Sequence, residues 1–155
     1  MKDQDRAAAK PFDFTGKYEH VLEPNGRLTL PVVYREQLER ALPAKYDPHL
    51  ILPCIVIYPL PIWYEFRAKL DVLPGNNEGA EDGKDFFMSY AFNCELDAQG
   101  RTHIPGELRT WAKIDRDVWL VGKGTRIEVW QSDEYERHCK ERDVTLRQRI
   151  KEFSL

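Results

Sequence analysis

The sequence predicts a mainly β protein with appended helices, built from two copies of one unit in tandem. Three observations lead to this fold class: an internal repeat, short segments in which apolar and polar residues alternate, and longer segments with apolar residues at helical spacing. Hydrophobic residues make up 42% and charged residues 32% of the 155 residues, so the chain can bury a core.

The repeat relates residues 19–38 (EHVLEPNGRLTLPVVYREQL) to residues 93–112 (NCELDAQGRTHIPGELRTWA), 74 positions later. Five of the twenty aligned positions are identical, and they include a Gly-Arg pair and the proline that follows the arginine by four residues. The correspondence continues, with a small slip, from residues 50–58 to residues 119–130. We therefore expect two units that share one fold.

The strands are expected to pair as hairpins within each unit. Residues 18–22 alternate in polarity and predict a strand, and residues 28–30 predict its partner after a turn at Gly26. Residues 50–58 and 118–130 are apolar and β-branched around a central interruption, which is typical of a hairpin.

Helices are expected after the strands of each unit. Pro31 and Pro105 suit the first turn of short helices over 32–41 and 106–113, because proline fixes a helical φ and needs no N–H partner there. The apolar spacing predicts three more helices: residues 61–73, residues 85–92, and a last helix with Ser132 as its N-cap. Arg142 interrupts the apolar stripe of the last helix, so its final third is expected to pack against a neighbouring subunit or to fray.

Charge and composition divide the chain further. The formal net charge of −3 arises wholly within residues 73–88, while the segments on either side are electrically neutral. This balance excludes a strongly basic DNA-coating protein and a polybasic membrane anchor, but it leaves room for a local DNA-binding face. The expected divisions are a flexible tail (1–13), a first unit with its C-terminal helix (14–73), an acidic linker rich in glycine and asparagine (74–84), a second unit (85–138) and the end of the C-terminal helix (139–155).

Residues typical of metal sites, disulfides and catalysis do not gather in the sequence. The three cysteines lack C-x-x-C spacing, the four histidines lack metal-ligand spacing, and no serine or cysteine lies in a nucleophile motif. We therefore expect no metal, no cofactor, no small-molecule substrate and no enzymatic activity. No run of 18 apolar residues occurs, so no membrane span is expected.

The repeated motif has a clear physical meaning in Glu23–Arg27 (EPNGR) and Asp97–Arg101 (DAQGR). The acidic side chain can accept hydrogen bonds from backbone N–H groups further along the turn. Gly26 and Gly100 supply the positive φ that a tight reversal needs. The simplest interpretation of one such motif is a hairpin turn with a local acid–arginine pair.

Four segments resemble the MraZ family of the SpoVT/AbrB-like superfamily: FTGKYEH, GRLTLPVVYREQL, CELDAQGRTHIPGELR and DRDVWLVGKGTRIEVW. The resemblance covers roughly residues 14 to 138 and includes both copies of the family's D-x-x-x-R signature. It implies two AbrB-type units that intertwine into a swapped-hairpin (double-split) β-barrel with pseudo-two-fold symmetry. It also implies a closed ring of chains, located in the cytoplasm with the nucleoid. That ring would regulate transcription in bacteria by binding repeated boxes of double-stranded DNA upstream of the division and cell-wall gene cluster.

The resemblance places the signature arginines at Arg27 and Arg101, the best candidates for DNA contact. Asn25 and Gln99 stand where many members have lysine; they can bond a phosphate or a base edge but bring no charge. Glu23 replaces the usual aspartate, which makes a local cap of the first turn less natural. The further candidate cations are Lys17, Lys123 and Arg126, and the turn-forming residues are Glu23, Gly26, Asp97 and Gly100.

Neutral units supply few cations, so strong DNA binding is expected only if a ring presents a weak site several times. Two alternatives stay open. A ring-forming scaffold of the same fold, with weakened or lost DNA binding, is favoured by Glu23, Asn25, Gln99 and the acidic linker. An antitoxin is a weaker alternative, because the chain is duplicated and lacks a disordered toxin-binding tail. Arg35 and Arg109 are expected either to pair with a nearby acid or to contact DNA or an interface.

Overall fold

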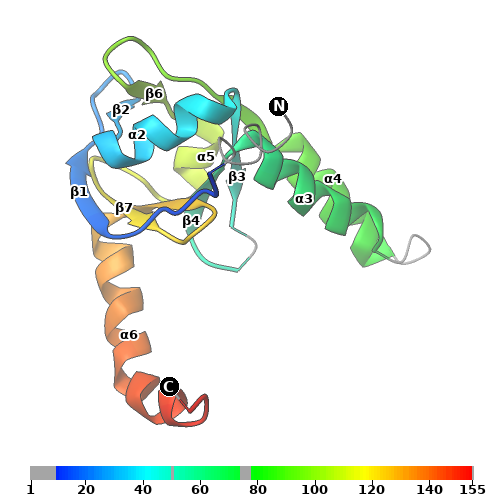
Figure 1. Cartoon of the computed structure of the whole chain (residues 1–155), viewed down its shortest axis with the longest axis vertical. Helices are drawn as coiled ribbons and strands as arrows, with labels where there is room; N and C mark the ends of the chain where they lie inside the picture. The colour runs from blue at the N-terminus through cyan, green and yellow to red at the C-terminus, as the bar shows by residue number, and fades with distance from the viewer. Residues whose placement is uncertain (1–9, 50, 74–77, 155) are drawn as a thin grey trace.

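The computed structural model describes residues 10–49, 51–73 and 78–154. A β core with helices around it confirms the predicted class (Figure 1). The strands are β1 (Lys17–Val21), β2 (Arg27–Thr29), β3 (Ala44–Pro48), β4 (Cys54–Tyr58), β5 (Phe92–Cys94), β6 (Arg101–His103), β7 (Asp117–Gly122) and β8 (Ile127–Gln131). The helices are α2 (Val32–Leu38), the 3₁₀ turn η1 (Glu39–Ala41), α3 (Leu60–Asp71), α4 (Glu78–Ser89), α5 (Gly106–Trp111) and α6 (Ser132–Lys151).

The two repeats interleave strand by strand. A six-stranded antiparallel sheet has the order β1-β7-β8-β4-β3-β5, and β2 pairs with β6 in a separate two-stranded ladder. The pairs β1–β7, β4–β8, β3–β5 and β2–β6 each join one repeat to the other. The two repeats therefore share one sheet and one core.

The expected hairpin between residues 18–22 and 28–30 is wrong beyond its turn. The Glu23 N–H donates to the Arg27 carbonyl at 2.9 Å, which closes the turn, but β1 then pairs with β7 and β2 with β6. The pairing with the other repeat continues past Val21, since the Leu22 N–H donates to the carbonyl of Arg116 at 2.7 Å, just before the turn begins.

The described strands do not close into the barrel that the resemblance implies. The six-stranded sheet is open, with β1 and β5 at its edges. The β2–β6 ladder is only three residues long on each side. It ends where Pro31 and Pro105, which have no N–H to donate, precede α2 and α5. Both prolines lie at the N-cap position rather than in the first turn.

The hairpins and helices differ from expectation mainly in their bounds. Residues 118–130 form the expected β7–β8 hairpin. The hairpin predicted over 50–58 is wrong in its first strand: residues 51–53 lie in the turn, and β4 pairs instead with β3 at 44–48. His49 Nδ1 accepts the N–H groups of Ile51 and Leu52 and so turns the chain there. Residue 50 lies outside the described residues, as do residues 74–77 of the predicted linker.

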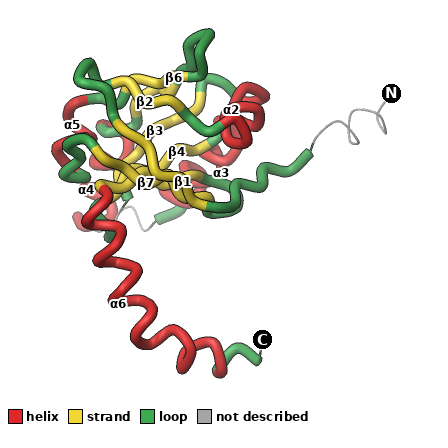
Figure 2. Tube along the Cα trace, turned by 90° about the vertical axis from the view of Figure 1, so that its left-hand side faces the viewer, coloured by secondary structure: helices red, strands yellow, loops and turns green. Residues whose placement is uncertain are grey.

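The helices α4 and α6 correct two further details. The helix expected over 85–92 spans Glu78–Ser89, so it includes most of the stretch interpreted as a linker. The last helix begins at Ser132 as predicted, but Gln131 occupies the cap position and no side chain caps the helix. α6 leaves the β core and remains helical to Lys151 (Figures 1 and 2), with Tyr135 its one buried residue. None of the described helices is long and apolar enough to cross a bilayer.

One hydrophobic cluster receives side chains from both repeats. The inward faces of the central strands carry Ile55, Ile57, Leu120, Ile127 and Val129, all fully buried. The β2–β6 ladder, α2 and α5 close this core from the other side, and their fully buried or nearly buried residues are Leu28, Leu30, Tyr34, Leu38, Ile104 and Leu108. Because the ladder packs on the core through its inward face, its outward face is left to solvent.

Candidate nucleic-acid interface

The signature arginines lie on one exposed face of the β2–β6 ladder. Arg27 pairs with His103, and Thr29 pairs with Arg101, so these four side chains share one face. The middle pair points the other way: Leu28 is fully buried, and Thr102 is 2% exposed. The alternation of a short strand therefore places the arginines of both repeats on the same surface.

The two turns that carry the signature lie at opposite ends of this ladder. Loop 1 (Glu23–Gly26) precedes β2, and loop 2 (Asp97–Gly100) precedes β6, and the strands are antiparallel. The carbonyl of Gly26 accepts the N–H of Ile104 at 2.9 Å. The carbonyl of Gly100 accepts the N–H of Leu30 at 3.1 Å. Each loop is thus hydrogen-bonded to the chain that leaves the other repeat's strand.

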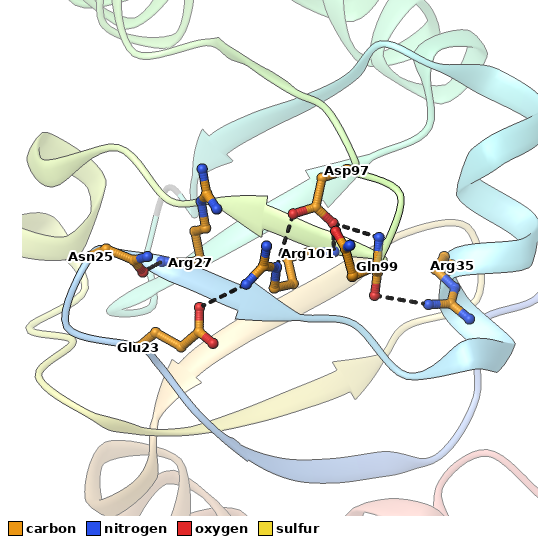
Figure 3. A network of polar contacts seen from close by, with 7 residues as sticks. All are labelled: Glu23, Asn25, Arg27, Arg35, Asp97, Gln99 and Arg101. Atoms are coloured by element: carbon orange, nitrogen blue, oxygen red, sulfur yellow. Dashed lines mark hydrogen bonds and ion pairs between the residues drawn. The ribbon is translucent and has the colours of Figure 1, made fainter.

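Loop 2 is capped by its own aspartate. Asp97 Oδ1 accepts the N–H groups of Gln99 and Arg101, both at 2.9 Å, and Asp97 Oδ2 accepts Arg101 Nε at 2.9 Å (Figure 3). These bonds, first that from the backbone N–H of Arg101, lower the pKa of Asp97 below its usual value. Gly100 has the expected positive φ, 76°. The Arg101 side chain is consequently held against its own loop.

Loop 1 repeats the backbone but not the side-chain pattern. The Gly26 N–H donates to the Glu23 carbonyl at 2.9 Å, as the equivalent groups do in loop 2, and Gly26 has φ 85°. The cap comes from Asn25, whose Oδ1 accepts the Arg27 N–H at 3.1 Å. The Glu23 carboxylate points toward Arg101 at the start of β6, with Oε2 3.8 Å from Arg101 Nη1 (Figure 3). Glutamate thus makes no local cap, in line with its extra methylene.

The two signature arginines consequently differ in their ion-pair partners. Arg101 Nε is 2.9 Å from Asp97 Oδ2, and its Nη1 is 3.8 Å from Glu23 Oε2. The exposed side chain of Arg27 has no hydrogen-bond or ion-pair partner in the part of the chain that the structure describes, and it points away from Glu23 (Figure 3). Arg27 is therefore the freer of the two to bind an anion.

Lys17, Lys123 and Arg126 lie at the other end of β1 and do not join this surface. β1 meets loop 1 after Val21, whereas Lys17 pairs with Val121 next to the β7–β8 turn that holds the other two residues. Lys17 Nζ is 5.3 Å from the centre of the Trp119 ring. Lys123 Nζ is 3.9 Å from the buried carboxylate of Glu128. The structure thus divides the predicted cations between two separate regions.

Arg35 and Arg109 belong to the loop region, with partners that the sequence did not indicate. Arg35 Nη1 donates to the carbonyl of Gln99 at 3.1 Å, not to an acid (Figure 3). Arg109 lies over Gly26: a Cβ on that glycine would be 3.3 Å from Arg109 Cζ. Both arginines occupy the same position in the repeat, and this shared position is what identified them as candidates. Their contacts depend on how the strands of one repeat pair with those of the other, which the repeat itself does not specify.

The comparisons with known proteins agree on one family. A family model described as "MraZ protein, putative antitoxin-like" matches residues 87–152. A curated protein named "Transcriptional regulator MraZ" from Moorella thermoacetica is 38% identical over 83% of this chain and 87% of its own length. Proteins of the same name from Thermoanaerobacter sp. (strain X514) and Lachnoclostridium phytofermentans are 36% and 33% identical, over 84% and 92% of this chain and 90% and 98% of theirs. The chain belongs to the MraZ family.

Proposed function

We propose that this protein is a transcriptional regulator that binds double-stranded DNA through the β2–β6 ladder and its two loops. The observation that carries the proposal is the shared exposed face of Arg27 and Arg101. The relatives of the chain bear the name transcriptional regulator, which supports the same function.

The shape and chemistry of this surface suit the major groove. A two-stranded β-ribbon fits into that groove, and an arginine can donate two hydrogen bonds to guanine or to a phosphate. Arg27 supplies such a guanidinium without first breaking an ion pair with any of the described residues. Asn25 and Gln99 are exposed in the adjacent turns and can bond base edges or phosphates.

The charge around the loops also favours an anionic partner. Four arginines lie on or over the loops, against the two carboxylates of Glu23 and Asp97. The four are Arg27, Arg35, Arg101 and Arg109. Among these six side chains the cations outnumber the carboxylates, although the whole chain carries a formal charge of −3.

One such surface per chain would bind DNA weakly, so we propose that several chains present it together. Chains in a closed ring would present the surface several times to repeated promoter boxes, those upstream of the division and cell-wall cluster, and effective concentration would raise affinity by ~10²–10⁴. Binding should weaken steeply with salt, because each neutralised phosphate releases counterions.

The direct test is a double substitution, Arg27→Ala/Arg101→Ala, with affinity measured by fluorescence anisotropy on the DNA upstream of the protein's own reading frame. We expect a loss of affinity of at least about tenfold, with an unchanged assembly mass. Arg67→Ala is the matched control, because Arg67 is an exposed arginine of α3. Unchanged affinity in the double variant would contradict the proposal.

A ring-forming scaffold of the same fold is the second candidate. The observation that favours it is the engagement of Arg101 by two carboxylates, which offsets part of the positive charge. A scaffold would keep its assembly mass and show no salt-dependent binding to promoter DNA. The same anisotropy titration therefore separates the two candidates.

A further inference from the structure

We propose that Arg35 and Arg109 are positioning residues that act crosswise: each arginine holds the DNA-facing loop of the other repeat. Arg35, from the first repeat, holds loop 2, and Arg109, from the second, holds loop 1. The consequence for DNA rests on the proposed function, whereas the crosswise support is a property of the fold alone.

The crossing follows from the strand pairing. Each arginine comes four residues after the proline that precedes its helix, and its N–H donates to that proline's carbonyl, at 2.9 Å for Arg35 and 3.1 Å for Arg109. α2 follows β2, and β2 runs antiparallel to β6. The start of α2 therefore lies beside the start of β6, where loop 2 ends, and α5 stands in the same relation to loop 1.

Arg35 holds loop 2 by a hydrogen bond and by packing. Its Nη1 donates to the Gln99 carbonyl at 3.1 Å, and a charged donor makes this bond stronger than one between neutral groups. Its side chain also fills the space beside Gly100, because a Cβ built there would lie 2.9 Å from Arg35 Cζ. The peptide held in this way joins Gln99 to Gly100 and lies one residue before Arg101.

Arg109 holds loop 1 by side-chain packing on Gly26. A Cβ on Gly26 would be 3.3 Å from both Cζ and Nη1 of Arg109, and 3.0 Å from His103 Nε2. Arg109 Nε is buried and has no hydrogen-bond partner among residues 10–49, 51–73 and 78–154. The support of loop 1 is consequently weaker than that of loop 2.

Amide hydrogen exchange on the assembled protein, without DNA, tests the crossing. In Arg35→Ala the amides of residues 97–101 should exchange about tenfold faster while those of residues 23–27 stay unchanged. In Arg109→Ala the pattern should reverse, with a smaller increase. Arg40→Ala is the control, since Arg40 follows α2 and donates to the Lys10 carbonyl at 3.0 Å, away from both loops.

Two results would overturn the proposal: faster exchange mainly in the loop of the substituted residue's own repeat, or no change in either loop. If Arg35→Ala raises amide exchange throughout the core, the variant is destabilised as a whole, and Arg35→Lys is then used as the test variant instead. Lysine keeps the charge and most of the length but lacks the planar guanidinium, so loop 2 should still exchange faster than in the wild-type protein.

A DNA titration then separates positioning from direct contact. Arg35→Ala should lower the affinity for promoter DNA with an unchanged slope of log affinity against log salt. A slope reduced by about one would mean that Arg35 contacts a phosphate, and it would overturn the positioning role. If the wild-type protein binds no DNA, the proposed function fails while the exchange experiment still decides the crosswise support.

Discussion

Loops 1 and 2 have the same backbone but different side-chain partners. In both, a glycine with positive φ donates its N–H to the carbonyl of the acidic residue, and that residue's N–H donates to the arginine carbonyl. In loop 2 the aspartate caps the turn and binds Arg101. In loop 1 Asn25 caps the turn, and the Glu23 carboxylate lies near Arg101 of the other repeat.

The difference shows that turn geometry and arginine availability are set separately. The glycine and the backbone hydrogen bonds fix the turn, so they survive the change from aspartate to glutamate. The length of the acidic side chain decides which arginine it binds. Arg101 therefore has two acidic neighbours and Arg27 has none in the described residues. We expect the two loops to contribute unequally to DNA binding.

The largest expected effect is on stability, and it tests the positive-φ glycine that both loops share. Gly100→Ala should destabilise the protein by ~1–3 kcal/mol, because alanine is strained at positive φ and its Cβ would overlap Arg35. Gly124→Ala isolates the strain, since Gly124 has φ 77° with open space around it. Urea denaturation measures both variants. Equal destabilisation of the two would contradict the close packing of Arg35 on loop 2.

The next largest effect tests whether Arg27 contributes more to DNA affinity than Arg101 does. Arg27→Ala should lower the affinity for promoter DNA by about tenfold, within the ~1–3 kcal/mol typical of a direct arginine contact. Arg101→Ala should cost less, because part of its charge is already offset by Asp97 and Glu23. Anisotropy titrations at one salt concentration compare the single variants, and a larger loss for Arg101→Ala would reverse the assignment.

A smaller effect should follow from releasing Arg101. Glu23→Gln removes one of its acidic neighbours and keeps the side-chain length, so DNA affinity should rise by about 1.4- to fivefold, as expected for a partly exposed ion pair worth ~0.2–1 kcal/mol. Glu136→Gln, in an exposed position on α6, controls for the change in net charge. An equal rise in both variants would show that only total charge matters.

The smallest expected effect is a pH dependence confined to loop 2. Because the pKa of Asp97 is lowered from 3.8, its carboxylate stabilises the folded loop above about pH 4, and this contribution is lost as the pH falls through the lowered value. The amides of residues 99–101 should therefore lose protection in acid before those of residues 25–27. Asp97→Asn should abolish that difference; its persistence would place the titrating group elsewhere.

The sequence was sufficient for the local features of this protein. The glycines predicted both turns, the prolines predicted the starts of α2 and α5 to within a residue, and apolar spacing predicted α3 and α6. These features depend on residues close together in the chain. Loop 2 also has the acid–arginine pair that the simplest interpretation predicted.

Contacts between the repeats could not be predicted in the same way. Periodicity shows that a segment is a strand but not which strand it pairs with, so β2–β6 and β1–β7 were missed. The partners of Arg35 depend on that pairing and were missed with it. β3 was not predicted because its sequence, AKYDP, combines charged residues and proline, which are uncommon in strands.

Protection of backbone amides by bound promoter DNA identifies the face of the protein that binds DNA. We expect the β2–β6 ladder with loops 1 and 2 to face DNA, rather than the β7–β8 turn with Lys123 and Arg126. Hydrogen exchange with and without saturating DNA should show slowed exchange over residues 23–29 and 97–103 and no change over residues 122–126. Protection of residues 122–126 without protection of the loops would contradict the account.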